Sequence, residues 1–166
     1  MQRAANTARQ AREHIESERC NVPKRVTVLG ATGSIGTSTL DLIGRNEHAI
    51  EVIAVTAHSS VERLAQCARD CRAERAVIGD PTLYGQLKEA LSGSNITPAA
   101  GNDALIEAAQ MPVDCTIAAI VGAAGLKPTV AAARCGGRLG LANKECRVSA
   151  GDVFMEEVAR AGCELI

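Results

Sequence analysis

Residues 26–36 read V-T-V-L-G-A-T-G-S-I-G, and the fold prediction starts from this stretch. The run of apolar and β-branched residues predicts a buried strand over 25–29. The glycines that follow predict a tight turn, and residues 34–45 have the pattern of a helix. A strand, a glycine-rich turn and a helix in this order are typical of the first unit of a nucleotide-binding α/β sheet.

The glycines at positions 30, 33 and 36 have separate expected roles. Gly30 permits the turn, Gly33 lets the backbone approach a pyrophosphate, and Gly36 lets the helix pack closely on the strand. The N–H groups of the first helical turn have no acceptor within the helix, and the helix dipole adds to their attraction for anions. We therefore expect a pyrophosphate site at Thr32, Gly33, Ser34 and Ile35. The alternative is an ordinary glycine-rich turn in a doubly wound sheet.

Beyond this unit, short β-branched runs alternate with longer helical patterns along the chain. Further strands are expected at 51–56, 76–78, 114–121 and 138–142, and another begins at 163. Helices are expected at 60–71, 81–91, 102–110, 126–135 and 148–161, with Asp80 as the N-cap of the second of these. Residues 92–100 are expected to form a loop, with a short strand at Ile96. The alternation predicts an α/β fold: a doubly wound, mostly parallel, Rossmann-like sheet between two helical layers.

The composition fits such a three-layer αβα domain. Of the 166 residues 46% are hydrophobic, yet there is no Trp, one Tyr and one Phe, so Ala, Val, Ile and Leu must form the core. The 18 basic and 19 acidic residues nearly cancel, which argues against binding to nucleic acid or to an anionic membrane. No apolar run approaches the roughly 20 residues that a membrane span needs, so a cytoplasmic location is expected.

The two ends of the chain differ from the region between them. Residues 1–23 are rich in Arg, Glu, Gln and Ala with little apolar periodicity, which predicts a flexible leader, and its acidic residues argue against an import signal. Residues 24–166 are expected to form one domain. Because the last strand begins at Cys163 and the sequence stops at Ile166, we expect a piece of a longer protein.

The seven cysteines indicate packing more than chemistry. Their number is odd and no C-x-x-C pair is present, so neither a disulfide framework nor a zinc site is expected. Cys67 and Cys71 lie four residues apart on an expected helix and share a face. They can in principle ligate a metal, but small apolar packing residues are the preferred interpretation.

The end of the second strand bears on which dinucleotide would bind. Residues 57–60 read A-H-S-S, and no carboxylate is present to grip a ribose 2′-hydroxyl. Ser59 and Ser60, at a helix N-terminus, can instead accept a 2′-phosphate, which favours NADP over NAD. His58 is interpreted either as a further donor or as an exposed loop residue.

Two later segments also follow strands. Residues 118–125, A-A-I-V-G-A-A-G, leave space for a flat nicotinamide ring. Residues 141–145, L-A-N-K-E, place three polar side chains after an apolar strand, where they can hold an anionic substrate and orient a ribose or ring amide. Taken alone, the triplet is equally consistent with a helix-capping turn at Asn143.

Together, the motifs at 30–36, 118–126 and 141–145, with S-T-L-D at 38–41, resemble the N-terminal domain of the 1-deoxy-D-xylulose 5-phosphate reductoisomerase family. The resemblance runs from about residue 25 to 166. It implies that NADPH is the cofactor, that a divalent metal (Mg or Mn) and a phosphorylated sugar bind in the complete enzyme, and that the family forms homodimers. It also implies that Asn143 and Glu145 contact the cofactor and that Lys144 contacts the substrate.

The resemblance implies as well that the isolated chain binds cofactor without turnover. The family's metal-binding carboxylates lie in a D-S-E motif that would begin just after Ile166, so no catalytic or metal-binding residue is expected within the chain. Two departures are His58-Ser59-Ser60, where the family has Gly or a basic residue with Asn, and Cys146 after N-K-E.

Two alternatives stay open. One is a catalytically silent NADP-binding or regulatory module. The other is a semialdehyde-dehydrogenase-like reductase, which shares a G-A-T-G-x-x-G turn but needs a nucleophilic cysteine with a histidine base. Cys146 is the cysteine whose position would suit it, and no histidine of this sequence is well placed as its partner.

Overall fold

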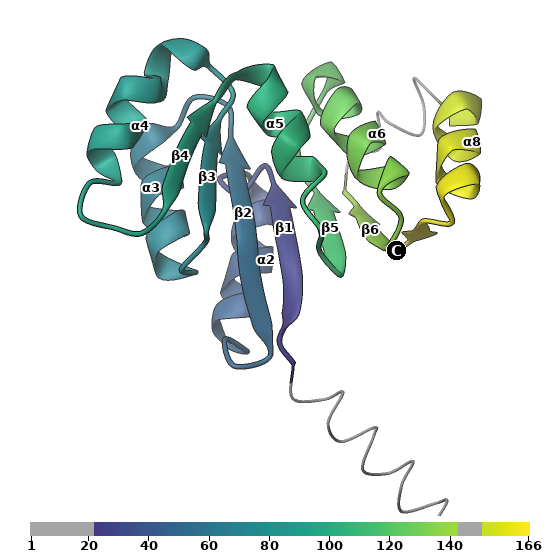
Figure 1. Ribbon diagram of the computed structural model, residues 1–166, viewed down its shortest axis with the longest axis horizontal. Helices are drawn as coiled ribbons and strands as arrows, with labels where there is room; N and C mark the ends of the chain where they lie inside the picture. The colour runs from purple at the N-terminus through teal and green to yellow at the C-terminus, as the bar shows by residue number, and fades with distance from the viewer. Residues whose placement is uncertain (1–21, 143–150) are drawn as a thin grey trace, which may run out of the picture.

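The structure is a computed structural model and describes residues 22–142 and 151–166. Nearly all of the expected leader, and residues 148–150 of the last expected helix, therefore lie outside the described residues. The centre of the fold is a sheet of seven strands in the order β4-β3-β2-β1-β5-β6-β7 (Figure 1), and every neighbouring pair is parallel. The strands are β1 (Lys24–Leu29), β2 (Ile50–Ala57), β3 (Arg75–Ile78), β4 (Thr97–Ala100), β5 (Cys115–Ala118), β6 (Arg138–Leu141) and β7 (Glu164–Leu165).

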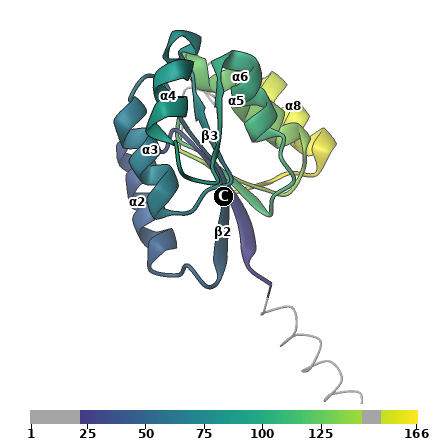
Figure 2. The same cartoon turned by 60° about the vertical axis from the view of Figure 1, so that its left-hand side comes forward.

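Helices cover both faces of the sheet, as the sequence predicts. They are α2 (Ser34–Gly44), α3 (Val61–Asp70), α4 (Tyr84–Ala90), α5 (Gly101–Ala109), α6 (Leu126–Arg134) and α8 (Gly151–Ala161), with short 3₁₀ turns at Pro81–Leu83 and Ala123–Gly125. Figure 2 shows α2, α3 and α4 on one side of the sheet and α5, α6 and α8 on the other. The prediction of a doubly wound, three-layer α/β fold is confirmed.

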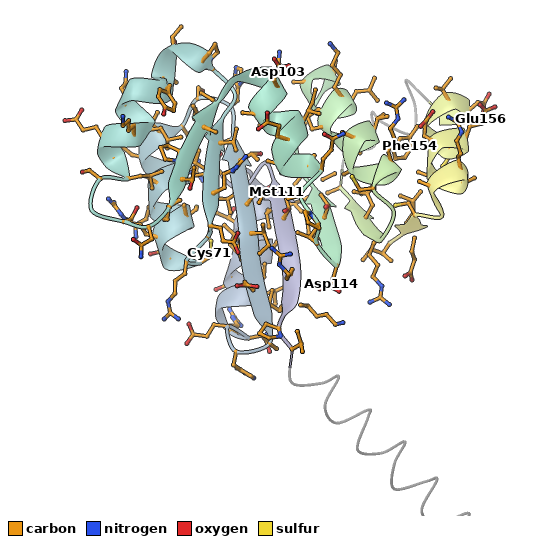
Figure 3. All side chains as sticks on the ribbon, viewed as in Figure 1. Cys71, Asp103, Met111, Asp114, Phe154 and Glu156 are labelled. Atoms are coloured by element: carbon orange, nitrogen blue, oxygen red, sulfur yellow. The ribbon has the colours of Figure 1, made fainter. Side chains whose placement is uncertain are left out.

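The alternation of side chains along β1 fills both layers of the core. Val26 and Val28 belong to the cluster under α2, α3 and α4, whereas Leu29 belongs to the cluster under α5, α6 and α8. Three consecutive alanines of α6, residues 131–133, are buried in the second cluster, and Phe154 of α8 fills the space beside them (Figure 3). The core is thus built from small aliphatic residues with one aromatic side chain, in agreement with the composition.

The order of the strands creates a switch point beside β1. The chain moves outward from β1 to β4, then crosses back over the sheet through α5 and continues from β5 to β7. The connections after β1 and after β5 therefore diverge to opposite faces. In open α/β sheets such a point, at the carboxyl ends of the strands, is where ligands bind. Gly30 and Ala119 follow β1 and β5 at this edge.

Three expected boundaries were wrong. The strand expected at 114–121 ends at Ala118, which pairs with Leu29 and Leu141, the last residues of β1 and β6 on either side. The loop expected at 92–100 contains β4, which pairs with β3 and begins one residue after Ile96. As a result, α5 begins at Gly101 directly after that strand.

The helix start expected at Asp80 is confirmed. The Asp80 carboxylate accepts hydrogen bonds from the Thr82 hydroxyl at 2.6 Å and from the Thr82 N–H at 2.9 Å, and Pro81 occupies the first position. These hydrogen bonds from Thr82 hold the pKa of Asp80 below its usual value. The first turn is 3₁₀, and the α-helix proper begins at Tyr84.

Candidate functional site

The turn after β1 can be formed only with glycine at two positions. Gly30 has φ +87°, and a Cβ there would lie 2.6 Å from the carbonyl oxygen of Ala119. A Cβ on Gly36 would lie 2.2 Å from the carbonyl oxygen of Gly30. The turn is therefore pressed between the end of β5 on one side and helix α2 on the other, which confirms the roles expected for these two glycines.

Gly33 is different, because the protein itself leaves room for a side chain. Its φ of −76° and ψ of 170° suit any residue. The nearest protein atom to an added Cβ would be the Gly30 carbonyl oxygen, at 3.5 Å. Neither backbone conformation nor packing requires glycine at this position. Glycine suits an N-cap, and its lack of a side chain lets a ligand approach the backbone closely.

Thr56, at the end of β2, holds the turn in place. Its hydroxyl accepts a hydrogen bond from the Gly30 N–H at 2.9 Å, and its carbonyl oxygen accepts one from the Ala31 N–H at 2.7 Å. Thr56 is fully buried. Two successive residues of the turn are thus fixed to one residue of the neighbouring strand.

The N-terminus of α2 is open for an anion. Gly33 is the N-cap residue and provides no side-chain acceptor, and the first turn contains no acidic residue. The first hydrogen bond that closes the helix is donated by the Thr37 N–H to the Gly33 carbonyl, so the N–H groups of Ser34, Ile35 and Gly36 have no acceptor within the helix. Ser34 and Ile35 are exposed. This arrangement of backbone donors can bind phosphate oxygens.

A cavity of about 280 Å³ lies beside this turn, across the carboxyl ends of β1, β2 and β5. It includes the residues that follow each of these strands and the first turns of α3 and α5. Its lining residues are Gly30, Thr32, Gly33, Thr56, Ala57, His58, Ser60, Arg63, Asn102, Leu105, Ala119, Ile120, Val121 and Ala124. Aspartate and glutamate are both absent from this described lining, so the cavity suits a ligand that carries negative charge.

The structure places the residues expected at the site in three groups. Thr32, Gly33 and Ser60 line the cavity. Ser34 and Ile35 lie on the exposed first turn of α2, and Ser59 is exposed at the end of β2 without lining the cavity. The remaining three, Asn143, Lys144 and Glu145, lie outside the described residues.

The residues that follow β2 lie largely where the sequence predicts them. The N-cap residue of α3 is Ser60, and its hydroxyl makes no capping hydrogen bond, which leaves it available to a ligand. His58 is exposed and also lines the cavity, and its role as a donor to the ligand stays a prediction. The residues expected to leave space for a ring, Ala119 and Ala124 among them, form the wall on the β5 side.

Sequence reasoning missed Arg63, Asn102 and Leu105. Arg63 follows Ser60 by three residues, so it lies in the first turn of α3, and this spacing was a usable signal. Asn102 and Leu105 lie one turn apart on α5, which crosses to the other face of the sheet. Nothing local in the sequence indicates that α5 returns to the end of β1, because that depends on the strand order.

Cys67 of α3 and Cys71, which follows this helix, support the packing interpretation. Burial raises the pKa of the Cys71 thiol to about 11, and burial is also the main cause that raises the pKa of Cys67. Cys71 packs against the larger core cluster. In Figure 3, Cys71 and Asp114 lie at the opposite end of the sheet from Asp103, which is in the first turn of α5. Within residues 22–142 and 151–166, no group of three or more His, Cys, Asp or Glu side chains could hold a metal ion.

None of the described helices combines the length and the apolar character that crossing a bilayer requires.

The sequence profile of one family, 1-deoxy-D-xylulose 5-phosphate reductoisomerase, matches residues 26–151. The chain belongs to this family. The reductoisomerase of Zymomonas mobilis is 57% identical over 144 residues, which are 87% of this chain and 37% of that protein. The reductoisomerase of Rhizobium meliloti is 51% identical over 148 residues, 88% of this chain and 38% of that protein. The chain spans little more than a third of the length of these curated relatives.

Solved reductoisomerase structures have the same fold over this region. The Zymomonas mobilis enzyme in complex with NADPH superposes with a TM-score of 0.86 at 56% identity, over 87% of this chain and 38% of that one. A reductoisomerase in complex with NADPH, fosmidomycin and magnesium superposes with a TM-score of 0.81 at 38% identity, over 86% of this chain and 35% of that one. The family resemblance inferred from the three motifs is therefore confirmed.

Proposed function

We propose that residues 24–166 are the NADPH-binding domain of a 1-deoxy-D-xylulose 5-phosphate reductoisomerase. The observation that carries the proposal is Gly33. It lies in the wall of the cavity, at the uncapped start of α2, in a conformation that does not need glycine. A diphosphate close to the backbone accounts for this residue, and the NADPH complex of a 56% identical enzyme supports the same ligand.

Different parts of the cavity would hold different parts of the dinucleotide. The diphosphate would lie against Thr32, Gly33, Ser34 and Ile35 and would accept hydrogen bonds from the N–H groups of the first turn of α2 that have no acceptor within the helix. The adenosine ribose and its 2′-phosphate would lie toward Ser59 and Ser60, on the β2 side. The nicotinamide would lie toward the small residues after β5. As the family resemblance implies, Asn143 and Glu145 would contact the cofactor and Lys144 the substrate.

The complete reaction needs more than this chain. When bound, NADPH supplies a hydride for reduction of the rearranged sugar phosphate to 2-C-methyl-D-erythritol 4-phosphate, in isoprenoid precursor synthesis. The residues described here bind and orient the cofactor; a divalent metal and its carboxylate ligands would complete the site. We also propose a cytoplasmic location and, for the complete enzyme, a homodimer that binds a small phosphorylated sugar.

Isothermal calorimetry tests the binding step. Titration of the purified chain with NADPH should give saturable heat with one site per chain. If neither NADPH nor NADP gives heat at millimolar concentration, the proposal is wrong.

A turnover assay tests the second part. The chain mixed with 1-deoxy-D-xylulose 5-phosphate, Mn²⁺ and NADPH should show no steady loss of absorbance at 340 nm. Steady consumption of NADPH would contradict the assignment of the chain as a binding domain without catalytic residues.

A further inference from the structure

Arg63 differs from every other arginine that the structure describes. The other eight each form an ion pair or donate a hydrogen bond within residues 22–142 and 151–166: Arg25, Arg45, Arg69, Arg72, Arg75, Arg134, Arg138 and Arg160. Arg63 does neither within those same residues. Its guanidinium group, with five N–H donors in a fixed fork, is therefore available to a ligand.

Helix stability does not explain an arginine at this position. Arg63 lies in the first turn of α3, where the N–H groups and the helix dipole already give a positive potential. A cation there is mildly unfavourable to the helix; Glu62, in the same turn, is the favourable kind of charge. An anion bound at this end would offset the repulsion between the guanidinium group and the helix dipole, because it would interact favourably with both.

Arg63 also lines the cavity, at the end where β2 stops. It is the one arginine or lysine among the described lining residues, and it shares this end with His58 and Ser60. Gly33 and the open turn of α2 lie in the wall toward β1. A dinucleotide with its diphosphate at α2 would thus extend its adenosine ribose toward Arg63.

We propose that Arg63 selects the phosphorylated dinucleotide by binding the phosphate on the 2′-oxygen of the adenosine ribose. This inference rests on the proposed function and names the residue that distinguishes NADPH from NADH. The fork of the guanidinium group matches two phosphate oxygens, so the contact is directional as well as electrostatic. The hydroxyl group of Ser60, the N-cap residue of α3, adds a second hydrogen-bond donor for this phosphate.

The test compares Arg63→Gln, Arg63→Lys and wild type by calorimetry with NADPH and, separately, with NADH. Arg63→Gln should weaken NADPH binding by about ten- to a hundred-fold, the range of one charge-assisted contact, and leave NADH binding within about twofold. Arg63→Lys should lie between Gln and wild type for NADPH, because it keeps the charge but not the fork.

Lys88→Gln is the matched control. Lys88 is exposed on α4, outside the cavity lining, and removal of its charge has the same effect on net charge. It should leave both affinities at wild-type values. All variants should keep a free energy of unfolding close to that of wild type, because neither Arg63 nor Lys88 makes an ion pair or hydrogen bond with the described residues.

Two results would overturn the inference, and they are distinguishable. If Arg63→Gln weakens NADPH and NADH equally, or weakens neither, Arg63 does not select the 2′-phosphate, while the proposed function stands. If wild type binds neither dinucleotide, the proposed function fails and the inference fails with it.

Discussion

The turn after β1 contains two glycines that the fold requires, Gly30 and Gly36, and one, Gly33, that we assign to ligand binding. Gly30 and Gly36 have backbone atoms of the protein where a Cβ would be, whereas Gly33 does not. The sequence predicted three glycine roles from spacing alone. The structure adds the distances that make these roles separable by experiment.

Gly33→Ala should change the free energy of unfolding by less than about 1 kcal/mol, because alanine accepts this conformation but is a poorer N-cap residue than glycine. It should weaken NADPH binding by about tenfold or more, since a methyl group would occupy the space where the diphosphate approaches the backbone. Gly36→Ala should instead lower the free energy of unfolding by about 1–3 kcal/mol through overpacking. Urea denaturation and calorimetry on both variants measure the two effects. Equal destabilisation by both would contradict this assignment.

Thr56→Val removes the acceptor for the Gly30 N–H with little change of shape. The unpaired N–H should cost about 1–3 kcal/mol of stability, and NADPH binding should weaken because the turn is less well held. Thr56→Ser keeps the hydroxyl and is the control: its affinity for NADPH should stay near that of wild type. If the valine variant binds as tightly as wild type, Thr56 does not position the turn.

At the scale of elements, sequence periodicity predicted most helices and strands to within a residue or two. It failed at β4 and after β5, for physical reasons. Pro98 and two alanines in residues 97–100 carry little β-propensity, and the strand forms because β3 offers an edge. Residues 119–121 are apolar, a pattern that predicts a strand, yet they line the cavity, and Val121 is 80% exposed. An apolar run does not reveal whether it faces a core or a ligand.

The attachment of α8 to α6 should depend on pH. The carboxylate of Glu157 accepts a hydrogen bond from Arg134 at 2.7 Å and forms an ion pair with Arg160 at 3.1 Å. The hydrogen bond from Arg134 is the main cause that lowers the pKa of Glu157. A carboxyl group whose pKa is lower in the folded state stabilises the fold above its unfolded pKa, and this contribution is lost as pH falls through the folded pKa.

Glu157→Gln should therefore lower the unfolding temperature at neutral pH, with the full difference above about pH 5 and a shrinking one below about pH 4. Glu156→Gln is the control, because the neighbouring Glu156 (Figure 3) is exposed and makes no ion pair within the described residues. Thermal unfolding followed by circular dichroism between these pH values measures both. A difference for Glu157→Gln that does not change with pH would rule out the carboxylate as its origin.

At the scale of the whole molecule, the strand order could not be read from the chain, although the α/β class could. Residues from α3 and α5, far apart in sequence and on opposite faces, meet only because the chain crosses from β4 to β5. For this reason Asn102 and Leu105 could not be predicted, whereas the residues of the glycine turn could; Arg63, three residues after Ser60, lies within reach of a local spacing argument. The polar triplet at 143–145 lies outside the described residues and stays a prediction.

The proposed domain boundary is tested by deletion. Removal of residues 1–21 should leave the unfolding temperature and the affinity for NADPH unchanged, because the sheet and the cavity consist of later residues. NADPH at about 100 times its dissociation constant should stabilise both forms by about 2.7 kcal/mol. Differential scanning fluorimetry with and without NADPH measures this. Loss of the cooperative transition in the shortened chain would show that the boundary is wrong.

The two outer strands differ in what they offer to another polypeptide. Pro98, in the middle of β4, lacks an N–H, so that margin of the sheet is a poor template for strand addition. At the other margin, β7 pairs with β6 on one side, and none of the described strands pairs with its second side. Aggregation by strand-to-strand growth should accordingly begin at β7, and a charged substitution at the exposed Ile166, next to this strand, should suppress it.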